Sequence, residues 1–352
     1  MRNIFITAVR TVVLLFFVLM TVSTFADNID YTKEYHPLIN KAELSIVEQD
    51  FAAALELYQQ AFKAVPAPFA RDYYNAAVCA MLLKDKKQSQ AYLEKLAVKG
   101  VSINYLAKQP VFDSLKTTKH WRKFRRKYSK YRKQYSSQVN PDLRADLDEL
   151  YARDQYFRQA EGGLRMYGDT LRKIETANTK LFLEWVEKHG YPGESLVGVA
   201  DTLEQLPRFS IIIQRQTKAR NGHDFSKVLV DAVQQGRLSP QAAAYLIEQQ
   251  VGRSKYGSKA YVKLNCNSCK NNLDGIDRYM EERRTDKELL TIEANRKLLG
   301  LEPFNDYKKK VLYSMDDKRF KLDYSWSVVN YQVPSEEAAK IMMERFVVAD
   351  AE

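Results

Sequence analysis

The chain has 352 residues, of which 45% are hydrophobic and 28% charged, a balance typical of a globular protein and unlike that of a disordered one. Its 13 glycines and 10 prolines are too few for a sandwich with many tight turns, so we expect mainly helix. The formal net charge of +11 is local, because residues 119–133 hold nine Lys or Arg and no acid, and residues 1–26 add two arginines. This distribution argues against nucleic acid as a partner.

The first 26 residues have the features of a cleaved export signal. Arg2 and Arg10 make the start basic, residues 12–20 are an uninterrupted apolar run, and small residues precede the end of the segment at Ala26. We expect cleavage after Ala26 and a periplasmic or secreted protein. An uncleaved membrane anchor is the alternative, although the apolar run is shorter than the roughly 18 residues that a membrane span needs.

Residues 27–118 show the spacing of small and aromatic residues that paired helices need. Four of them follow the A-x3-Y-x2-A-x4-P pattern of the second helix of a tetratricopeptide repeat: Ala54, Tyr58, Ala61 and Pro66. A second helical hairpin is expected at 72–100. The region resembles the tetratricopeptide-like modules of bacterial proteins, which implies a stack of hairpins with a concave surface for a protein partner.

Residues 119–139 predict one linker helix with two different faces. Five aromatic residues recur at spacings of three and four: Trp121, Phe124, Tyr128, Tyr131 and Tyr135. We expect this stripe to pack on one or both domains while the basic side chains stay in solvent. The alternative is a cationic helix that binds an anionic membrane surface or envelope polymer. Its binding candidates are Trp121, Arg122, Arg125, Arg126 and Tyr128.

Residues 140–352 are expected to form a second, larger and mainly helical domain. Pro141 and Pro240 each stand where a helix begins. Only 259–265 and 320–333 alternate between apolar and polar residues as strands do, and the two segments could pair as a small sheet. The sequence therefore predicts a mainly α fold, in which tetratricopeptide-like hairpins precede an α-rich domain with a small β element.

Four short motifs lie between 142 and 307. They are D-Q-x-x-R from Asp154, H-G-Y-P from His189, Y-G-S from Tyr256 and G-L-E-P from Gly300. Together they resemble an uncharacterised group of bacterial domains of unknown function, often secreted and sometimes attached to tetratricopeptide modules. The resemblance implies a helical domain with a cluster of polar groups and brings no established activity.

The chain departs from this group at three places. The group usually has Gln-His where this chain has Gln214 and Arg215, and Asp-Arg where it has Glu248 and Gln249. It usually has Y-G-T-Q where this chain has Y-G-S-K, which ends at Lys259. The lost histidine and the changed acid weaken any inference of an inherited reaction.

Four polar residues are weak candidates for a hydrolase-like active site: Asp154, Gln155, Gln214 and Glu248. The histidines are too far apart in sequence to be paired metal ligands, and there is no G-x-S-x-G nucleophile elbow or Gly-rich phosphate loop. A non-enzymatic protein or polymer interaction module is therefore the favoured function, with a hydrolase as the alternative. We expect no cofactor and no metal.

Cys266 and Cys269 form one C-x-x-C pair in a chain with three cysteines. A zinc site needs about four protein ligands, and this spacing supplies half of them. A thioredoxin-like dithiol should follow a strand and open a helix, whereas this pair lies among asparagines typical of a loop. In an oxidising compartment a local disulfide is favoured, with a redox dithiol, a metal half-site or unpaired thiols as alternatives. The third cysteine, Cys79, is expected to be a buried, inert core residue.

Overall fold

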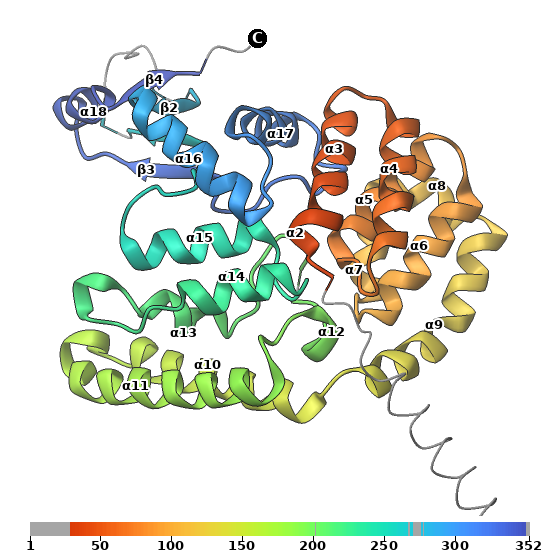
Figure 1. The fold of residues 1–352 in the computed structure, drawn as a ribbon, viewed down its shortest axis with the longest axis horizontal. Helices are drawn as coiled ribbons and strands as arrows, with labels where there is room; N and C mark the ends of the chain where they lie inside the picture. The colour runs from red at the N-terminus through yellow and green to blue at the C-terminus, as the bar shows by residue number, and fades with distance from the viewer. Residues whose placement is uncertain (1–28, 201, 267, 270–275, 277, 350–352) are drawn as a thin grey trace, which may run out of the picture.

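The computed structural model describes residues 29–200, 202–266, 268–269, 276 and 278–349. The fold is mainly helical with one small sheet (Figure 1), which confirms the fold class expected from the sequence. Within these residues, no helix combines the length and the apolar character needed to cross a membrane. The predicted signal segment, 1–26, lies outside the described residues.

The N-terminal part is a stack of helical hairpins. Its first helices are α2 (Tyr31–Glu34), α3 (His36–Val47), α4 (Phe51–Ala64), α5 (Ala70–Leu82) and α6 (Lys86–Val98). The second helix of each hairpin begins at an acidic cap, because the side chains of Asp50 and Asp85 accept hydrogen bonds from the backbone of the first turn. Cys79 is fully buried, and burial raises the pKa of its thiol to about 12, so it is a core residue as expected.

Short elements and one long helix close this stack. They are α7 (Ile103–Ala107), the 3-10 turn η1 (Pro110–Phe112), α8 (Asp113–Lys116) and α9 (Lys119–Gln138). Helix α9 packs against α6 and runs along the outer side of the hairpins (Figure 1). The side chains of Phe112, Leu115 and Trp121 are buried there, which covers the end of the hairpin core.

The C-terminal part consists mainly of helices. They are α10 (Pro141–Gln159), α11 (Gly163–His189), α12 (Glu194–Val197), α13 (Ser210–Arg215), η2 (Lys218–Arg220), α14 (Ser226–Gln234), α15 (Pro240–Val251), α16 (Asp286–Leu299), α17 (Phe304–Asp316) and α18 (Glu336–Met343). Helices α10 and α15 begin at Pro141 and Pro240, as predicted, and the preceding Asn140 and Ser239 cap them.

A four-stranded sheet lies at the far end of this part, in the order β3-β1-β2-β4. Its strands are β1 (Tyr261–Asn265), β2 (Met280–Glu282), β3 (Val328–Gln332) and β4 (Phe346–Val348). Strand β1 pairs with β3 in parallel and with β2 in antiparallel orientation. The predicted pairing of the two alternating segments is therefore confirmed for β1 and β3. Tyr261 points to a core with α16 and α17, and Leu264 to a core with α18.

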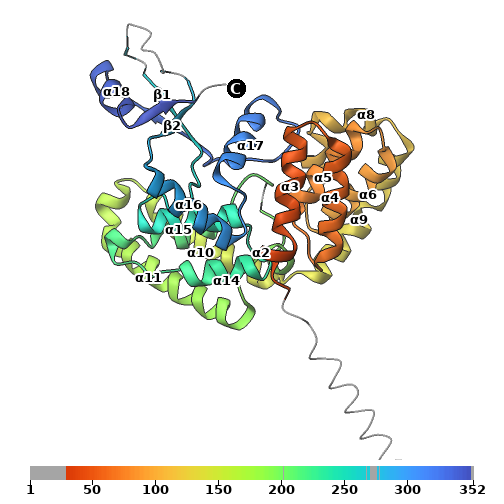
Figure 2. The ribbon, with the colours of Figure 1, turned by 45° about the horizontal axis from the view of Figure 1, so that its top comes forward.

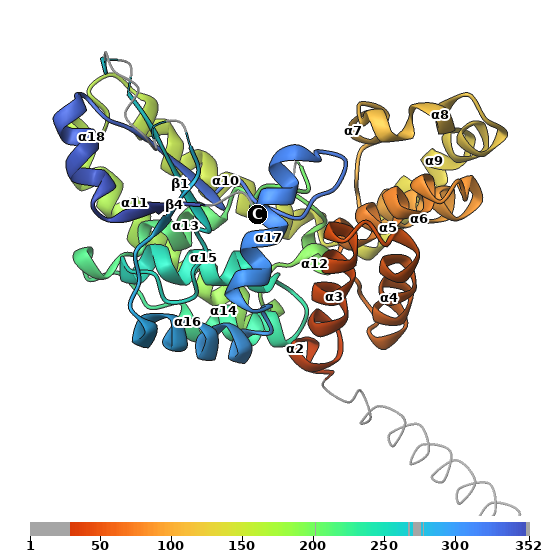
Figure 3. The same cartoon turned by 90° about the horizontal axis from the view of Figure 1, so that it is seen from above.

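The two parts contact each other along α3 and α5. Helix α17 packs against α3, and Figures 2 and 3 show it between the sheet and the hairpins. The chain then passes along α5, where Phe320 and Leu322 join the core of the hairpins. Asn75 and Arg71 of α5 both bind the backbone of Lys321. Part of the face formed by α3 and α5 is therefore covered by the chain's own C-terminal part.

Candidate functional site

The aromatic stripe of α9 is the attachment of this helix to the hairpins. Trp121, Phe124 and Tyr131 are buried. The hydroxyl of Tyr128 donates to the carbonyl of Val101 at 3.2 Å and accepts a hydrogen bond from the backbone of residue 103 at 3.1 Å. Of the five sequence-predicted binding residues, Trp121 and Tyr128 therefore point into the fold and serve packing.

The end of the stripe is fixed by a close approach to the backbone. The ring of Tyr135 lies against Gly100, where a Cβ would come within 2.7 Å of the ring, and Gly100 has φ +102°. Only glycine suits this position, for both reasons. Arg132 stacks on the same ring at 4.4 Å and donates to the carbonyl of Gly100 at 2.7 Å. Arg132 is thus a structural member of the basic segment.

The opposite face of α9 carries exposed cations. At about 100° per residue, six of them fall within an arc of about 100° centred opposite the aromatic stripe. We call this set the basic stripe: Lys119, Arg122, Lys123, Arg126, Lys130 and Lys133. All six are exposed, and Arg125 and Lys127 flank them and are exposed as well. Three of the predicted binding residues, Arg122, Arg125 and Arg126, therefore face solvent.

The basic stripe has no ion-pair partner in the part of the chain that the structure describes. The nearest ion pairs along the chain are Lys116 with Asp113, before α9, and Arg144 with Asp148, after it. Within the described residues, no member of the stripe takes part in an ion pair. The stripe extends over 15 residues, and the 14 steps from its first to its last residue correspond to about 21 Å of helix. Such a row of like charges attracts anions, and this attraction becomes weaker as salt is added.

The catalytic candidates around Asp154 form a closed ion-pair cluster. The buried carboxylate of Asp154 accepts from Gln155 Nε2 at 2.8 Å and from Arg158 Nε at 3.0 Å, and lies 3.7 Å from Arg215 Nη2. Arg158 also pairs with Glu175 of α11. Because Gln155, Arg158 and Arg215 already engage the oxygens of Asp154, this arrangement ties α10 to α11 and α13 and does not resemble a general base.

The candidate Glu248 lies on α15 and has a different set of partners. Its carboxylate accepts backbone hydrogen bonds from Lys255 at 2.7 Å, Tyr256 at 2.5 Å and Ser258 at 3.1 Å, and a further one from the Ser258 hydroxyl. These partners all belong to the loop 255–258, and none comes from α10 or α13. Glu248 therefore anchors a loop. The fourth candidate, Gln214, is half-buried on α13.

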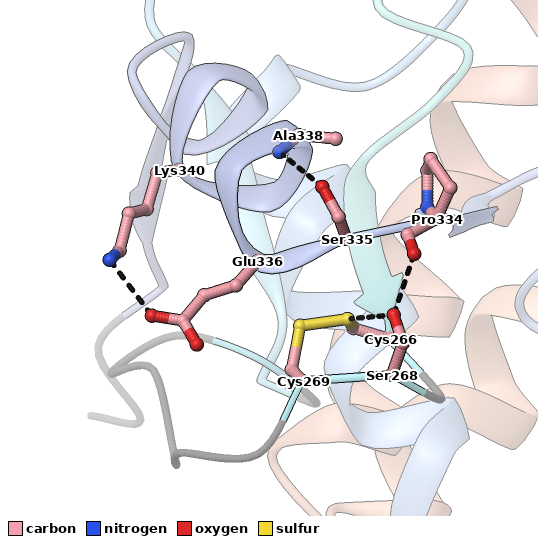
Figure 4. Close-up of a disulfide and its surroundings, with 8 residues drawn as sticks. All are labelled: Cys266, Ser268, Cys269, Pro334, Ser335, Glu336, Ala338 and Lys340. Carbon is pink, nitrogen blue, oxygen red and sulfur yellow. Dashed lines mark hydrogen bonds and ion pairs between the residues drawn. A yellow bond between two sulfur atoms is a disulfide. The ribbon is translucent and has the colours of Figure 1, made fainter.

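Cys266 and Cys269 are joined by a disulfide, with their Cα atoms 5.5 Å apart (Figure 4). Cys266 directly follows β1, and both sulfurs lie at the edge of the core between the sheet and α18. Between them, Ser268 Oγ donates to the carbonyl of Pro334 at 2.6 Å, just before the cap of α18. The bridge thus holds a turn beside the start of this helix. In the described part of the chain, no three acidic, His or Cys side chains are grouped as metal ligands would be.

Comparisons of the chain with protein-family models, with curated proteins and with solved structures find no match. Function is therefore inferred from the geometry of this chain.

Proposed function

We propose that this protein is an exported, non-enzymatic interaction module of the cell envelope, and that the basic stripe of α9 binds an anionic polymer. One observation carries the proposal. Six cations share the face of α9 opposite its buried aromatic stripe, and the described protein supplies no acidic partner for them. Export rests on the basic, apolar and small-residue sequence of 1–26. The tetratricopeptide-like hairpins hold α9 in a fixed position through its buried aromatic side chains.

A polymer suits this surface better than a membrane does. An amphipathic helix that lies on a bilayer buries its apolar face among the lipids. In α9 that face is already used, since Trp121, Phe124 and Tyr131 pack in the hairpin core. The remaining charges form a narrow row of about 21 Å, which matches a linear chain of phosphates, sulfates or carboxylates.

We also propose that the hairpins bind a protein partner, and the fold limits which of their surfaces that partner can contact. The face of α3 and α5 is in part covered by α17 and by Lys321. A partner would therefore contact the outer helix α4 and the part of α6 that α9 leaves exposed. The hydrolase-like alternative has less support, because the carboxylates of Asp154 and Glu248 are both engaged in internal hydrogen bonds.

The test compares two variants with the same change in net charge. One replaces the six residues of the basic stripe by Gln. The control replaces six exposed lysines elsewhere by Gln: Lys41, Lys63, Lys87, Lys173, Lys287 and Lys297. Binding to fluorescent dextran sulfate is measured with neutral dextran as the ligand control. We expect the stripe variant to lose at least tenfold in affinity and most of the salt dependence, and the control variant to bind like the wild type.

Two outcomes would contradict the proposal. An equal loss in both variants would mean that net charge alone drives binding. Binding to vesicles that contain phosphatidylglycerol, without binding to dextran sulfate, would assign the stripe to a membrane surface.

A further inference from the structure

A groove of about 780 Å³ lies in the C-terminal part, between the start of α11 and the segment 215–222, which runs from the end of α13 past η2. Helix α11 packs against α13 here (Figure 1). The volume falls within the range of roughly 300–1,000 Å³ that is typical of ligand pockets. The described lining of this groove includes no residue of the basic stripe or of the hairpins.

Arginines outnumber acids in the lining of this groove. Asp169 is paired with Arg172 on the same helix. Arg215 and Glu175 both belong to the ion-pair cluster of Asp154, in which two acids and two arginines compensate one another. Both lining acids are therefore already neutralised by the protein. The charged residues that line the groove are Arg165, Arg172, Arg215, Arg220, Asp169 and Glu175.

Two of these arginines, Arg165 and Arg220, have no acidic partner in the part of the chain that the structure describes. Both side chains are exposed, and they stand on opposite walls, one on α11 and the other at the end of η2. Lys218 on η2 is exposed as well, whereas the exposed Glu161, just before α11, does not line the groove. Each exposed guanidinium can bind a carboxylate through two parallel hydrogen bonds.

Two large apolar side chains are exposed at the same groove. Leu164 is 54% exposed and Met166 is 67% exposed, and they stand on either side of Arg165 in the first turn of α11. Exposed apolar side chains with a charged rim are typical of a surface that contacts another molecule. The unbranched side chain of Met adapts well to an irregular partner.

The lining favours a peptide over a lipid or a sugar. A lipid chain needs a mainly apolar wall, and in this groove charged and polar residues predominate. A sugar ring commonly packs on an aromatic side chain, and none of the described lining residues is aromatic. Clusters of arginines are a recurring means of binding acidic peptide motifs, and apolar contacts add to their affinity.

We propose that this groove binds an extended acidic peptide of a partner protein. The guanidinium groups of Arg165 and Arg220 each bind a carboxylate of the peptide, and an apolar side chain between the two acids contacts Leu164 and Met166. This site is independent of the basic stripe and of the surface of the hairpins, because it is made of different residues on a different part of the chain.

The probe is the fluorescein-labelled peptide Gly-Glu-Leu-Glu-Gly with a blocked C-terminus. The matched control is Gly-Gln-Leu-Gln-Gly, which has the same shape and no side-chain charge. Fluorescence anisotropy with the full mature chain at low salt should show at least about fivefold tighter binding of the acidic peptide. The double variant Arg165→Gln/Arg220→Gln should lose this preference, because the two free cations of the groove are gone.

A second double variant, Arg122→Gln/Arg126→Gln, removes the same charge from the basic stripe and should bind the acidic peptide like the wild type. Leu164→Ser should weaken binding of both peptides by at least about threefold. Its control, Leu290→Ser on α16, changes a side chain that is 72% exposed and should have no effect. All the substituted side chains are exposed, so each variant should fold like the wild type.

Several results would overturn the proposal. Equal affinity for the two peptides in the wild type, or no binding of either, would show that the groove does not select acids. A loss of binding in the Arg122→Gln/Arg126→Gln variant as large as in the groove variant would assign the peptide to the basic stripe or to net charge. Unchanged binding in Leu164→Ser would exclude the apolar contact.

Discussion

Asn75 and Lys321, 246 residues apart in the chain, form two reciprocal hydrogen bonds. Asn75 Nδ2 donates to the carbonyl of Lys321 at 3.1 Å, and the backbone N–H of Lys321 donates to Asn75 Oδ1 at 2.8 Å. The side-chain amide of Asn75 on α5 therefore forms the same pair of hydrogen bonds to the extended backbone of Lys321 that a neighbouring β-strand would form. Since Asn75 is fully buried, this pair is a main polar contact between the two parts of the chain.

Asn75→Ala should lower the free energy of unfolding by about 1–3 kcal/mol, because it leaves the half-buried N–H of Lys321 without its acceptor. The matched control is Gln60→Ala on the exposed side of α4, which should change stability by less than about 0.5 kcal/mol. Urea unfolding of both variants measures the difference. Equal stability of the two variants would show that the Asn75 contact does not hold the parts together.

Lys310→Met should be among the most destabilising single changes, with a cost of about 3–5 kcal/mol, because it leaves the buried carboxylates of Glu43 and Glu302 facing each other without their shared cation. Adding Glu43→Gln should recover part of this loss, since Glu43 is the carboxylate left without a cation, whereas Glu302 keeps Arg296 at 3.6 Å. A double-mutant cycle by urea unfolding measures the coupling. Purely additive effects of the two substitutions would contradict the shared ion pair.

His36 and Asp72 should make opposite contributions to the pH dependence of stability. Burial lowers the pKa of His36 from 6.5 to about 3, so between these values the unfolded state binds a proton that the native state does not. That contribution to stability is lost as the pH falls. Burial and Glu43 raise the pKa of Asp72 from 3.8 to about 7, so there the native state holds a proton that the unfolded state has lost. That contribution is lost as the pH rises.

Single substitutions should separate the two effects between pH 4 and pH 6. In Asp72→Asn only His36 still contributes to the pH dependence of stability. The free energy of unfolding should then rise with pH more steeply than in the wild type, by about 1.4 kcal/mol per pH unit. In His36→Asn the slope of the free energy of unfolding against pH should be lower than in the wild type by about the same amount. Urea unfolding at a series of pH values measures the slopes, and parallel curves for all three proteins would refute both assignments.

Glu248→Gln should loosen the loop 255–258 without unfolding α15. The neutral amide is a weaker acceptor than the carboxylate that now accepts from the backbone of Lys255, Tyr256 and Ser258. Hydrogen exchange of these three amides should become faster, while exchange in the middle of α15 should stay unchanged. Unchanged exchange in the loop would show that Glu248 does not anchor it.

Local sequence signals predicted much of this fold. Pro141 and Pro240 mark helix starts because proline fits the first turn, where its missing N–H is not needed. The aromatic stripe of α9 was expected to pack, because residues three and four apart share one face of a helix. Both predictions depend on neighbours in the chain, and such neighbours are visible in a sequence.

Contacts between distant residues were not predictable in this way. Glu43 and Lys310 are separated by 267 positions, and no pattern in either segment indicates the other. Residues 320–324 alternate like a strand, yet Phe320 and Leu322 pack against helices of the hairpins and only residues from 328 onward enter the sheet. Alternation shows that a segment is extended with one buried face, and it does not identify the surface that covers that face.

The hydrogen bonds of Arg71 and Asn75 on α5 to the backbone of Lys321 and Asp323 also set an order of assembly. During synthesis the hairpins emerge first, and Arg71 and Asn75 stay without their partners until the ribosome has added about 250 further residues. In that interval the face of α3 and α5 is open to other extended segments. In the finished protein, by contrast, the two parts are joined by the backbone between α9 and α10, by these hydrogen bonds, by the packing of α17 on α3 and by the ion pair of Lys310 with Glu43. Cleavage of the backbone between α9 and α10 would therefore leave the two fragments bound to each other. Fragments made separately should reassemble through the face of α3 and α5.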